Sequence, residues 1–152
     1  MTELYTALSM QLKGLFLGER NKIANLANAS AAIFASLREL NWAGFYLVED
    51  GELVLGPFQG KVACIRIPFG RGVCGTAAEK NETQVVADVH QFAGHIACDS
   101  ASNSEIVIPL HGREGKVVGV LDIDSTVLSR FTPDDKEGLE ALAKIIESSI
   151  DW

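Results

Sequence analysis

The chain has 152 residues, of which 47% are hydrophobic and 22% are charged, a composition typical of one globular domain and not of a disordered chain. Its 13 Lys and Arg against 20 Asp and Glu give a formal net charge of −7, which argues against nucleic acid or an anionic membrane as partner, because both favour a basic surface. The N-terminus lacks a signal-peptide pattern and no stretch approaches the roughly 20 apolar residues of a membrane span, so we predict a cytoplasmic protein whose cysteines rest as thiols.

Two helices are predicted at the N-terminal end of the chain. The first covers residues 3–13 and places Leu4, Leu8 and Leu12 on one face. The second covers residues 21–40 and has the stronger helical pattern. Its expected buried stripe is Ile23, Leu26, Ser30, Ile33 and Leu37.

The pattern then changes to short β-strands separated by turn residues. Residues 42–48 and 52–57 predict a hairpin, because Glu49-Asp50-Gly51 between them is a turn signal. A second hairpin is expected from strands 105–111 and 116–122. The remaining expected elements are a strand at 62–67 containing Cys64, a glycine-rich turn at 68–72, a helix at 73–80 carrying Cys74 near its start, a strand at 84–89, and a polar loop at 90–104 that holds Cys98.

The last helix has the clearest start signal in the chain. Thr132 is a good N-cap, Pro133 suits the first helical position, and Asp135 follows three residues after the cap. The order of elements predicts an α+β fold with a central, mainly antiparallel sheet of about six strands and the N- and C-terminal helices packed on one face. We expect one domain over residues 1–152, divided into N-terminal helices (1–40), sheet and pocket loops (41–126) and a C-terminal helix (131–152).

The three cysteines, Cys64, Cys74 and Cys98, are the candidate reactive groups. Their wide spacing matches neither a CxxC redox pair nor a zinc site, and the histidines at 90 and 95 add no close ligand pair, so no metal or other cofactor is expected. Cys64 alone fits a small buried hydrophobe. Cys98 is harder to interpret as inert, because buried thiols prefer apolar runs and its loop is polar.

Four motifs carry a resemblance that covers nearly the whole chain. They are Asn41-Trp-Ala-Gly-Phe-Tyr46, Gly70-Arg-Gly-Val-Cys-Gly-Thr76, Ser104-Glu-Ile-Val-Ile-Pro-Leu110 and Gly119-Val-Leu-Asp-Ile-Asp-Ser125. Together with the three cysteines, these motifs resemble the GAF-domain enzymes that reduce free methionine-(R)-sulfoxide. The resemblance implies a single GAF-like domain.

The resemblance also implies a role for each candidate residue. Cys98 matches the nucleophile, Cys64 matches its resolving disulfide partner, and Cys74 matches a thiol that can take part in resolution. Thioredoxin is the implied reductant, and a homodimer with the N-terminal helices as candidate contacts is the implied assembly. The residues that match the substrate pocket are Trp42, Tyr46, Glu105, Asp122 and Asp124.

The residue chemistry agrees with such a reaction. A thiol can attack the sulfur of a sulfoxide and keep the oxygen as a sulfenic acid, which a second thiol condenses to a disulfide for a dithiol donor to reduce. Asp99 and Glu105 lie near Cys98 in sequence and would raise its pKa. We therefore expect the acids to protonate the sulfoxide oxygen and to pair with the ammonium of a free amino acid, with Trp42 and Tyr46 as flat walls for the S-methyl group.

Two other classes of function stay open from the residues. One is a non-catalytic GAF sensor that binds a small ligand such as a nucleotide, although a sensor does not need three thiols. The other is a thiol redox sensor in which the disulfide itself is the signal. The acids at 122 and 124 alternate with apolar residues and could also form a solvent-facing strand side. Trp42 and Tyr46 could equally be ordinary core residues.

Overall fold

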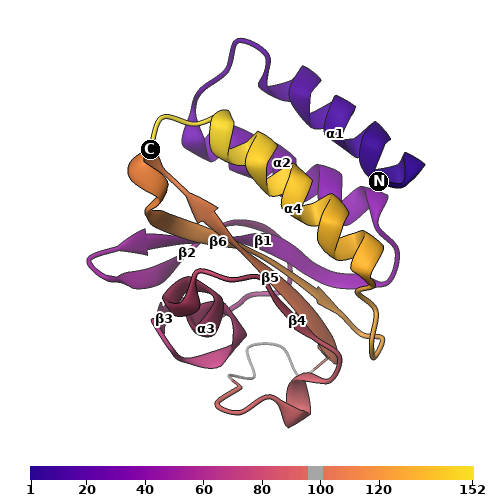
Figure 1. Cartoon of the computed structure of the whole chain (residues 1–152), viewed down its shortest axis with the longest axis vertical. Helices are drawn as coiled ribbons and strands as arrows, with labels where there is room; N and C mark the ends of the chain where they lie inside the picture. The colour runs from indigo at the N-terminus through magenta and orange to yellow at the C-terminus, as the bar shows by residue number, and fades with distance from the viewer. Residues whose placement is uncertain (96–100) are drawn as a thin grey trace.

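A computed structural model of the protein describes residues 1–95 and 101–152 (Figure 1). The α-helices are α1 (Glu3–Phe16), α2 (Lys22–Ser36), α3 (Gly72–Lys80) and α4 (Pro133–Ser148). The strands are β1 (Leu40–Glu49), β2 (Glu52–Gly60), β3 (Arg66–Pro68), β4 (Gln84–Val86), β5 (Ser104–His111) and β6 (Val117–Ser125). Two short 3₁₀ turns are η1 (Val89–Gln91) and η2 (Arg113–Gly115).

The strands form one six-stranded sheet in the order β3-β2-β1-β6-β5-β4. Every pair of neighbours is antiparallel. The two predicted hairpins, β1–β2 and β5–β6, are both present, and their inner strands β1 and β6 pair at the centre of the sheet. The predicted antiparallel sheet of about six strands is confirmed.

The helices lie in two unequal groups on the two faces of the sheet (Figure 1). Helix α2 packs on β1 and β2, α4 packs on β5, and α1 forms an outer layer against α2 and α4. The expected packing of the N- and C-terminal helices on one face is therefore confirmed. Of the α-helices in the described part of the chain, α3 is the one on the opposite face, where it packs against β5 and β6.

Strand alternation divides the core into two clusters. On β1, Ala43 and Phe45 point into the large cluster under the three long helices. Trp42 and Tyr46 point the other way, into a smaller cluster with α3. Both faces of β1 are therefore covered, which explains why its sequence is apolar without a polar side.

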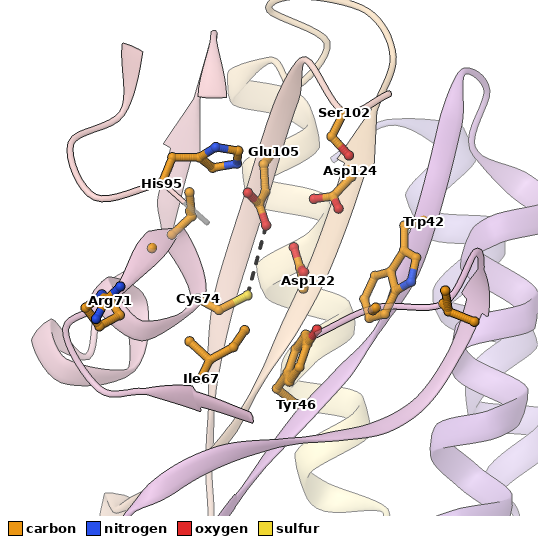
Figure 2. Close-up of a pocket in the computed structure, with 14 residues that line it drawn as sticks. Trp42, Tyr46, Ile67, Arg71, Cys74, His95, Ser102, Glu105, Asp122 and Asp124 are labelled. Carbon is orange, nitrogen blue, oxygen red and sulfur yellow. Dashed lines mark hydrogen bonds between the residues drawn. The ribbon is translucent and has the colours of Figure 1, made fainter. Parts of the chain in front are cut away.

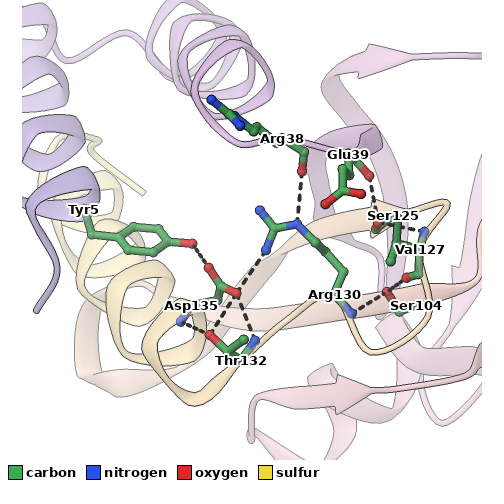
Figure 3. A network of polar contacts seen from close by, with 9 residues as sticks. All are labelled: Tyr5, Arg38, Glu39, Ser104, Ser125, Val127, Arg130, Thr132 and Asp135. Atoms are coloured by element: carbon green, nitrogen blue, oxygen red, sulfur yellow. Dashed lines mark hydrogen bonds and ion pairs between the residues drawn. The ribbon is translucent and has the colours of Figure 1, made fainter.

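A polar network joins α1 to the start of α4 (Figure 3). The Tyr5 hydroxyl donates to Asp135 Oδ1 at 2.6 Å, and Arg130 donates to Asp135 Oδ2 at 3.1 Å. Thr132 caps α4 in a full capping box with Asp135, as the sequence predicts. Burial opposes ionisation of Asp135, but hydrogen bonds from Thr132 and Tyr5 outweigh it and hold the pKa of this carboxyl below its usual value.

The predicted strand at 62–67 is wrong for most of its length. Strand β3 pairs with β2 only through Arg66–Pro68, and Cys64 lies in the segment that precedes it. Val62 and Ile65 are 88% and 68% exposed, so the apolar run that suggested a buried strand lies largely in solvent. Strand β4 is also shorter than expected and ends at Val86, while Val89 belongs to η1.

The buried faces predicted for the two N-terminal helices are confirmed except at their first positions. Leu4 and Ile23 are 44% and 63% exposed, and Tyr5 and Ala29 are buried in addition to the predicted residues. The predicted residues that are buried are Leu8, Leu12, Leu26, Ser30, Ile33 and Leu37. Small residues on α2 allow close packing on the sheet, so the buried face follows alanines as well as large side chains. Helix α2 also ends at Ser36, four residues earlier than expected. Within the described residues, no helix combines the length and apolar character needed to cross a membrane.

Candidate functional site

A pocket opens between α3, the β2–β3 segment and the α3 face of the central strands (Figure 2). All five residues expected to bind substrate line it, as does Cys74. Cys64 belongs to the segment that borders the pocket, and Cys98 lies outside the described residues. The lining residues are Trp42, Tyr46, Val62, Ala63, Ile67, Arg71, Gly72, Val73, Cys74, His95, Ser102, Glu105, Asp122 and Asp124.

Strand register brings the three acids side by side. Glu105 on β5 is the direct partner of Asp124 on β6, and Asp124 is in turn the partner of Trp42 on β1. Asp122, two residues before Asp124 on the same strand, points to the same face. The three carboxyl groups and the Trp42 ring therefore occupy one continuous patch of the sheet (Figure 2), and this excludes a solvent-facing role for the acids.

Glu105 is an acid of the pocket with a strongly perturbed pKa. It is 7% exposed, and burial raises the pKa of its carboxyl well above the usual value, with the charges of Asp122 and Asp124 adding to the effect. Its Oε2 accepts a long hydrogen bond from the Cys74 thiol, 4.0 Å away. The Glu105 carboxyl is therefore suited to holding a proton in this site.

Asp122 offers the pocket an acceptor that the protein itself does not use. It is 5% exposed, and its Oδ1 is buried without a hydrogen-bond partner among the described residues. Burial of an unpaired carboxylate oxygen is costly, so this atom favours an incoming donor or cation. Asp122 is thus the natural contact for a positively charged group of a ligand.

Cys74 and Cys64 are in different chemical states. Cys74 is a free, buried thiol in the first turn of α3, and burial followed by the charges of Asp122 and Glu105 raises its pKa well above the usual value. Cys64 is disulfide-bonded. Cys74 is consequently neutral and a weak nucleophile, although its position in the pocket is fixed.

Three buried groups could together ligate a metal ion. Ligand atoms of Cys74, Glu105 and Asp122 all lie within 4.8 Å of one another. Sequence spacing indicated no such cluster, because these residues come from α3, β5 and β6 and meet only in the folded chain.

An aromatic wall faces the acids and also holds the segment that carries Cys64. The Trp42 ring stacks on Phe58 at 5.0 Å and on Tyr46 at 5.9 Å between ring centroids. Trp42 Nε1 donates to the carbonyl of Lys61 at 3.1 Å, and the Tyr46 hydroxyl donates to the carbonyl of Cys64 at 2.9 Å. The two rings are therefore both pocket walls and anchors of residues 61–64.

A basic side of the pocket was not anticipated from the sequence. Arg71 and His95 line it opposite the aromatic wall (Figure 2), and α3 begins there without a side-chain cap. The segment at 68–72 is a turn, as predicted, with positive φ at Gly70 and Gly72, but it also presents Arg71 and the positive end of α3 to the pocket. Burial, with the neighbouring His90, lowers the pKa of His95 and keeps its ring neutral near pH 7.

Hydrogen bonds to the sheet and to η1 hold Ser102 and Asn103 in place. Asn41 donates to Ser102 Oγ at 2.9 Å. The backbone N–H of Asn103 donates to the carbonyl of Ser125 at 2.8 Å, and the N–H of Val89 donates to the carbonyl of Asn103 at 2.9 Å. Ser102 and Asn103 are therefore tied to β1, which carries Trp42, and to β6, which carries Asp122 and Asp124.

The curled antiparallel sheet, helices on both faces and a pocket under α3 define a GAF domain, and the GAF domain profile matches residues 24–151. Free methionine-R-sulfoxide reductase of Escherichia coli is 57% identical over 96% of this chain and 88% of that protein. The enzyme of the same name from Saccharomyces cerevisiae is 49% identical over 97% of this chain and 86% of its own length. The chain therefore belongs to the GAF-domain family of free methionine-R-sulfoxide reductases.

A solved structure supports the same assignment. Free methionine-R-sulfoxide reductase from Neisseria meningitidis in complex with its substrate superposes with a TM-score of 0.91 at 48% identity, covering 95% of this chain and 87% of that one. The similarity thus extends over almost the whole fold. The chain is an oxidoreductase of this family.

Proposed function

We propose that this protein reduces free L-methionine-(R)-sulfoxide to L-methionine through a cysteine sulfenic acid and an intramolecular disulfide. The observation that carries the proposal is the cluster of buried Glu105 and Asp122 with half-buried Asp124, which faces the Trp42–Tyr46 wall. A free amino acid sulfoxide has a cationic ammonium, an oxygen to be protonated and an apolar methyl group, and the pocket offers a counterpart to each. The named activity of the relatives and the substrate complex of the Neisseria enzyme support the same substrate.

The substrate ammonium is assigned to Asp122 and Asp124. The unused Oδ1 of Asp122 would gain a charge-assisted hydrogen bond, which is shorter and stronger than a neutral one. The substrate carboxylate would then face Arg71 and the N-terminal end of α3, where a helix favours negative charge. Methionine within a peptide has neither charge, so this arrangement would reject it.

Glu105 is assigned the role of general acid. Because its pKa is raised, it carries a proton that it can give to the sulfoxide oxygen as the sulfur is attacked. Protonation makes the sulfur more electrophilic and compensates for a nucleophile that the surrounding acids do not activate. The S-methyl group would lie against Trp42 and Tyr46, with favourable sulfur–aromatic contacts.

Cys98 is assigned as the nucleophile and Cys64 as the resolving residue. The Cys98 sulfur attacks the sulfoxide sulfur, retains the oxygen as a sulfenic acid and is oxidised by two electrons, while methionine leaves reduced by two electrons. The Cys64 thiol then displaces the oxygen as water and closes the disulfide. Thioredoxin returns both cysteines to thiols, which requires a compartment such as the cytoplasm where dithiol donors stay reduced.

Cys74 is assigned to the pocket and not to the first disulfide. It is buried and neutral, so it resolves a sulfenic acid less readily than a residue in the β2–β3 segment. Its hydrogen bond to Glu105 Oε2 suits it to keeping the acid in place. No metal has a part in this scheme.

Methionine release from free methionine-(R)-sulfoxide in the presence of dithiothreitol tests the proposal. The wild-type chain should release methionine over many turnovers, and Cys98→Ser should release none. Cys64→Ser with thioredoxin should form one equivalent of methionine and then stall. Full steady-state activity of Cys98→Ser would refute the assignment.

Two further comparisons separate the enzyme from a sensor. The wild-type chain should turn over free methionine sulfoxide and leave the N-acetylated compound unreduced, because the latter lacks the ammonium that Asp122 would bind. A small-ligand sensor would release no methionine from either compound. A thiol redox sensor would form its disulfide with a general oxidant and gain no rate from the sulfoxide.

A homodimer is part of the same proposal. Helix α1 exposes Leu4 and Met10, and Leu17 and Ile23 are exposed nearby at the α1–α2 connection. Apolar side chains grouped on two neighbouring helices suit an interface between copies of the chain. Light scattering should give the mass of a dimer, and Met10→Lys together with Ile23→Lys should give a monomer.

A further inference from the structure

The segment that carries Cys64 exposes apolar side chains on both sides of the cysteine. Val62 is 88% exposed and Ile65 is 68% exposed. Cys64, which lies between them, is half-buried and disulfide-bonded. Single exposed aliphatic residues are common on protein surfaces. Here, however, two exposed aliphatic side chains flank the sulfur of Cys64, which a macromolecular reductant has to approach.

The backbone of this segment is held from one side and open on the other. The carbonyls of Lys61, Cys64 and Ile65 accept hydrogen bonds from Trp42, Tyr46 and the N–H of Leu55. Among the described residues, none forms a hydrogen bond with the backbone of Val62 or Ala63. A short, rigidly anchored segment with unpaired peptide groups is suited to pairing with an extended segment of a partner.

We propose that residues 62–65 are the docking surface for the dithiol protein that recycles the enzyme, and that its thiolate attacks the sulfur of Cys64. This inference rests on the proposed function. Cys74 is buried inside the pocket, so it offers no route for a protein-sized reductant. The exposed aliphatic pair beside Cys64 supplies apolar contact, and the open peptide groups supply orientation.

The exchange balances in two steps. The donor thiolate bonds to the Cys64 sulfur, the enzyme disulfide breaks, and the released cysteine of this chain takes up a proton. The second donor thiol then attacks the mixed disulfide and frees Cys64 as a thiol. Overall the donor loses two electrons and two protons, and the two enzyme cysteines gain them.

Turnover driven by thioredoxin, compared with turnover driven by dithiothreitol, tests the proposal with Ile65→Asp. Ile65 does not line the pocket, so dithiothreitol-driven turnover should be unchanged. The KM for thioredoxin should rise about tenfold, the effect of losing one aliphatic contact. Leu128→Asp, at a 54% exposed position in the β6–α4 connection, is the matched control and should leave both unchanged.

An unchanged KM for thioredoxin in Ile65→Asp would overturn the docking surface. Failure of dithiothreitol to drive the wild-type chain would instead overturn the proposed function. A shift of oligomeric state in Ile65→Asp would show that a second copy of the chain covers the surface, which also overturns the proposal.

A trapping experiment gives an answer that does not depend on the folding of a variant. Thioredoxin that lacks its second active-site cysteine cannot complete the exchange, so it should remain attached to the wild-type oxidised chain. Peptide mass mapping should find it on Cys64. Attachment to another cysteine would overturn the proposal.

Discussion

Replacement of Glu105 by Gln should change activity and stability in opposite directions. Carboxyl oxygens of Glu105 and Asp122 lie within 4.8 Å of each other, so the two charges would repel by at least about 3.5 kcal/mol at an effective dielectric constant of about 20. Burial and this repulsion keep Glu105 protonated in the folded protein. The amide of Gln keeps the shape of the side chain and stays neutral without a bound proton. It cannot supply a proton, so kcat should fall by about 10²–10⁴, the usual contribution of a general acid.

The stability effect should depend on pH, with a definite sign. The pKa of Glu105 is raised in the folded protein, so its neutral form favours folding at acidic pH, and that stability is lost as the pH rises above the unfolded pKa toward the folded one. Gln does not ionise, so the variant does not lose this stability as the pH rises. The free energy of unfolding of Glu105→Gln, minus that of the wild type, should therefore increase from acidic to neutral pH.

Urea unfolding over a pH series and single-turnover formation of methionine are the two assays. Glu49→Gln is the control, because Glu49 is an exposed acid on strand β1 of the same sheet, and it should leave activity and the pH dependence of stability unchanged. A wild-type rate in Glu105→Gln would remove Glu105 from the chemistry. A stability difference that is independent of pH, or that decreases with rising pH, would refute the electrostatic reasoning.

Three further results are expected. Tyr5→Phe should lower the free energy of unfolding by about 1.5–3 kcal/mol at neutral pH, because it removes a 2.6 Å hydrogen bond to the charged Asp135. This difference in stability should shrink as the pH falls through the lowered pKa of Asp135. An unchanged urea midpoint at neutral pH would contradict the prediction. Gly138→Ala should destabilise by about 1–3 kcal/mol, because its Cβ would lie 2.2 Å from Tyr5 Cγ; a stabilised variant would show that α1 moves freely on α4. Cys74→Ser should keep thioredoxin-driven turnover, and a stall after one equivalent of methionine would make Cys74 the resolving residue.

Elements with strong local signals were predictable from the sequence. The start of α4 depends on Thr132, Pro133 and Asp135, which act within one helical turn, and the hairpin turns are equally local. The prediction of a strand at 62–67 was wrong for most of its length, because an apolar composition alone does not show whether a segment is buried. Residues 61–64 are instead held by the side chains of Trp42 and Tyr46, and those contacts cross about twenty positions of sequence.

The site was predictable only in part, for a related reason. The family motifs identified Trp42 and the acids, but their contact depends on the register between β5, β6 and β1, which periodicity does not fix. Arg71 belongs to a turn, and His95 appeared only as a weak metal ligand. Arg71 reaches the pocket because α3 folds back over the sheet. His95 follows Gly94, whose carbonyl accepts a hydrogen bond from the N–H of Gly72 at the start of α3, and neither arrangement has a local sequence signal.

The acidic residues of the pocket bear on how the reaction is accelerated. Three acids and a neutral thiol oppose formation of a thiolate nearby, as the raised pKa of Cys74 illustrates. Cations beside a thiol would activate it, but the proposed mechanism assigns Arg71 to the substrate carboxylate. In that mechanism the rate therefore comes from activation of the electrophile. In the proposed mechanism a free amino acid would bring its own cation to Asp122, reduce the repulsion among the acids and leave Glu105 as the proton donor. On this reasoning the substrate ammonium is a component of the catalytic site, and a sulfoxide without it should lose kcat as well as affinity.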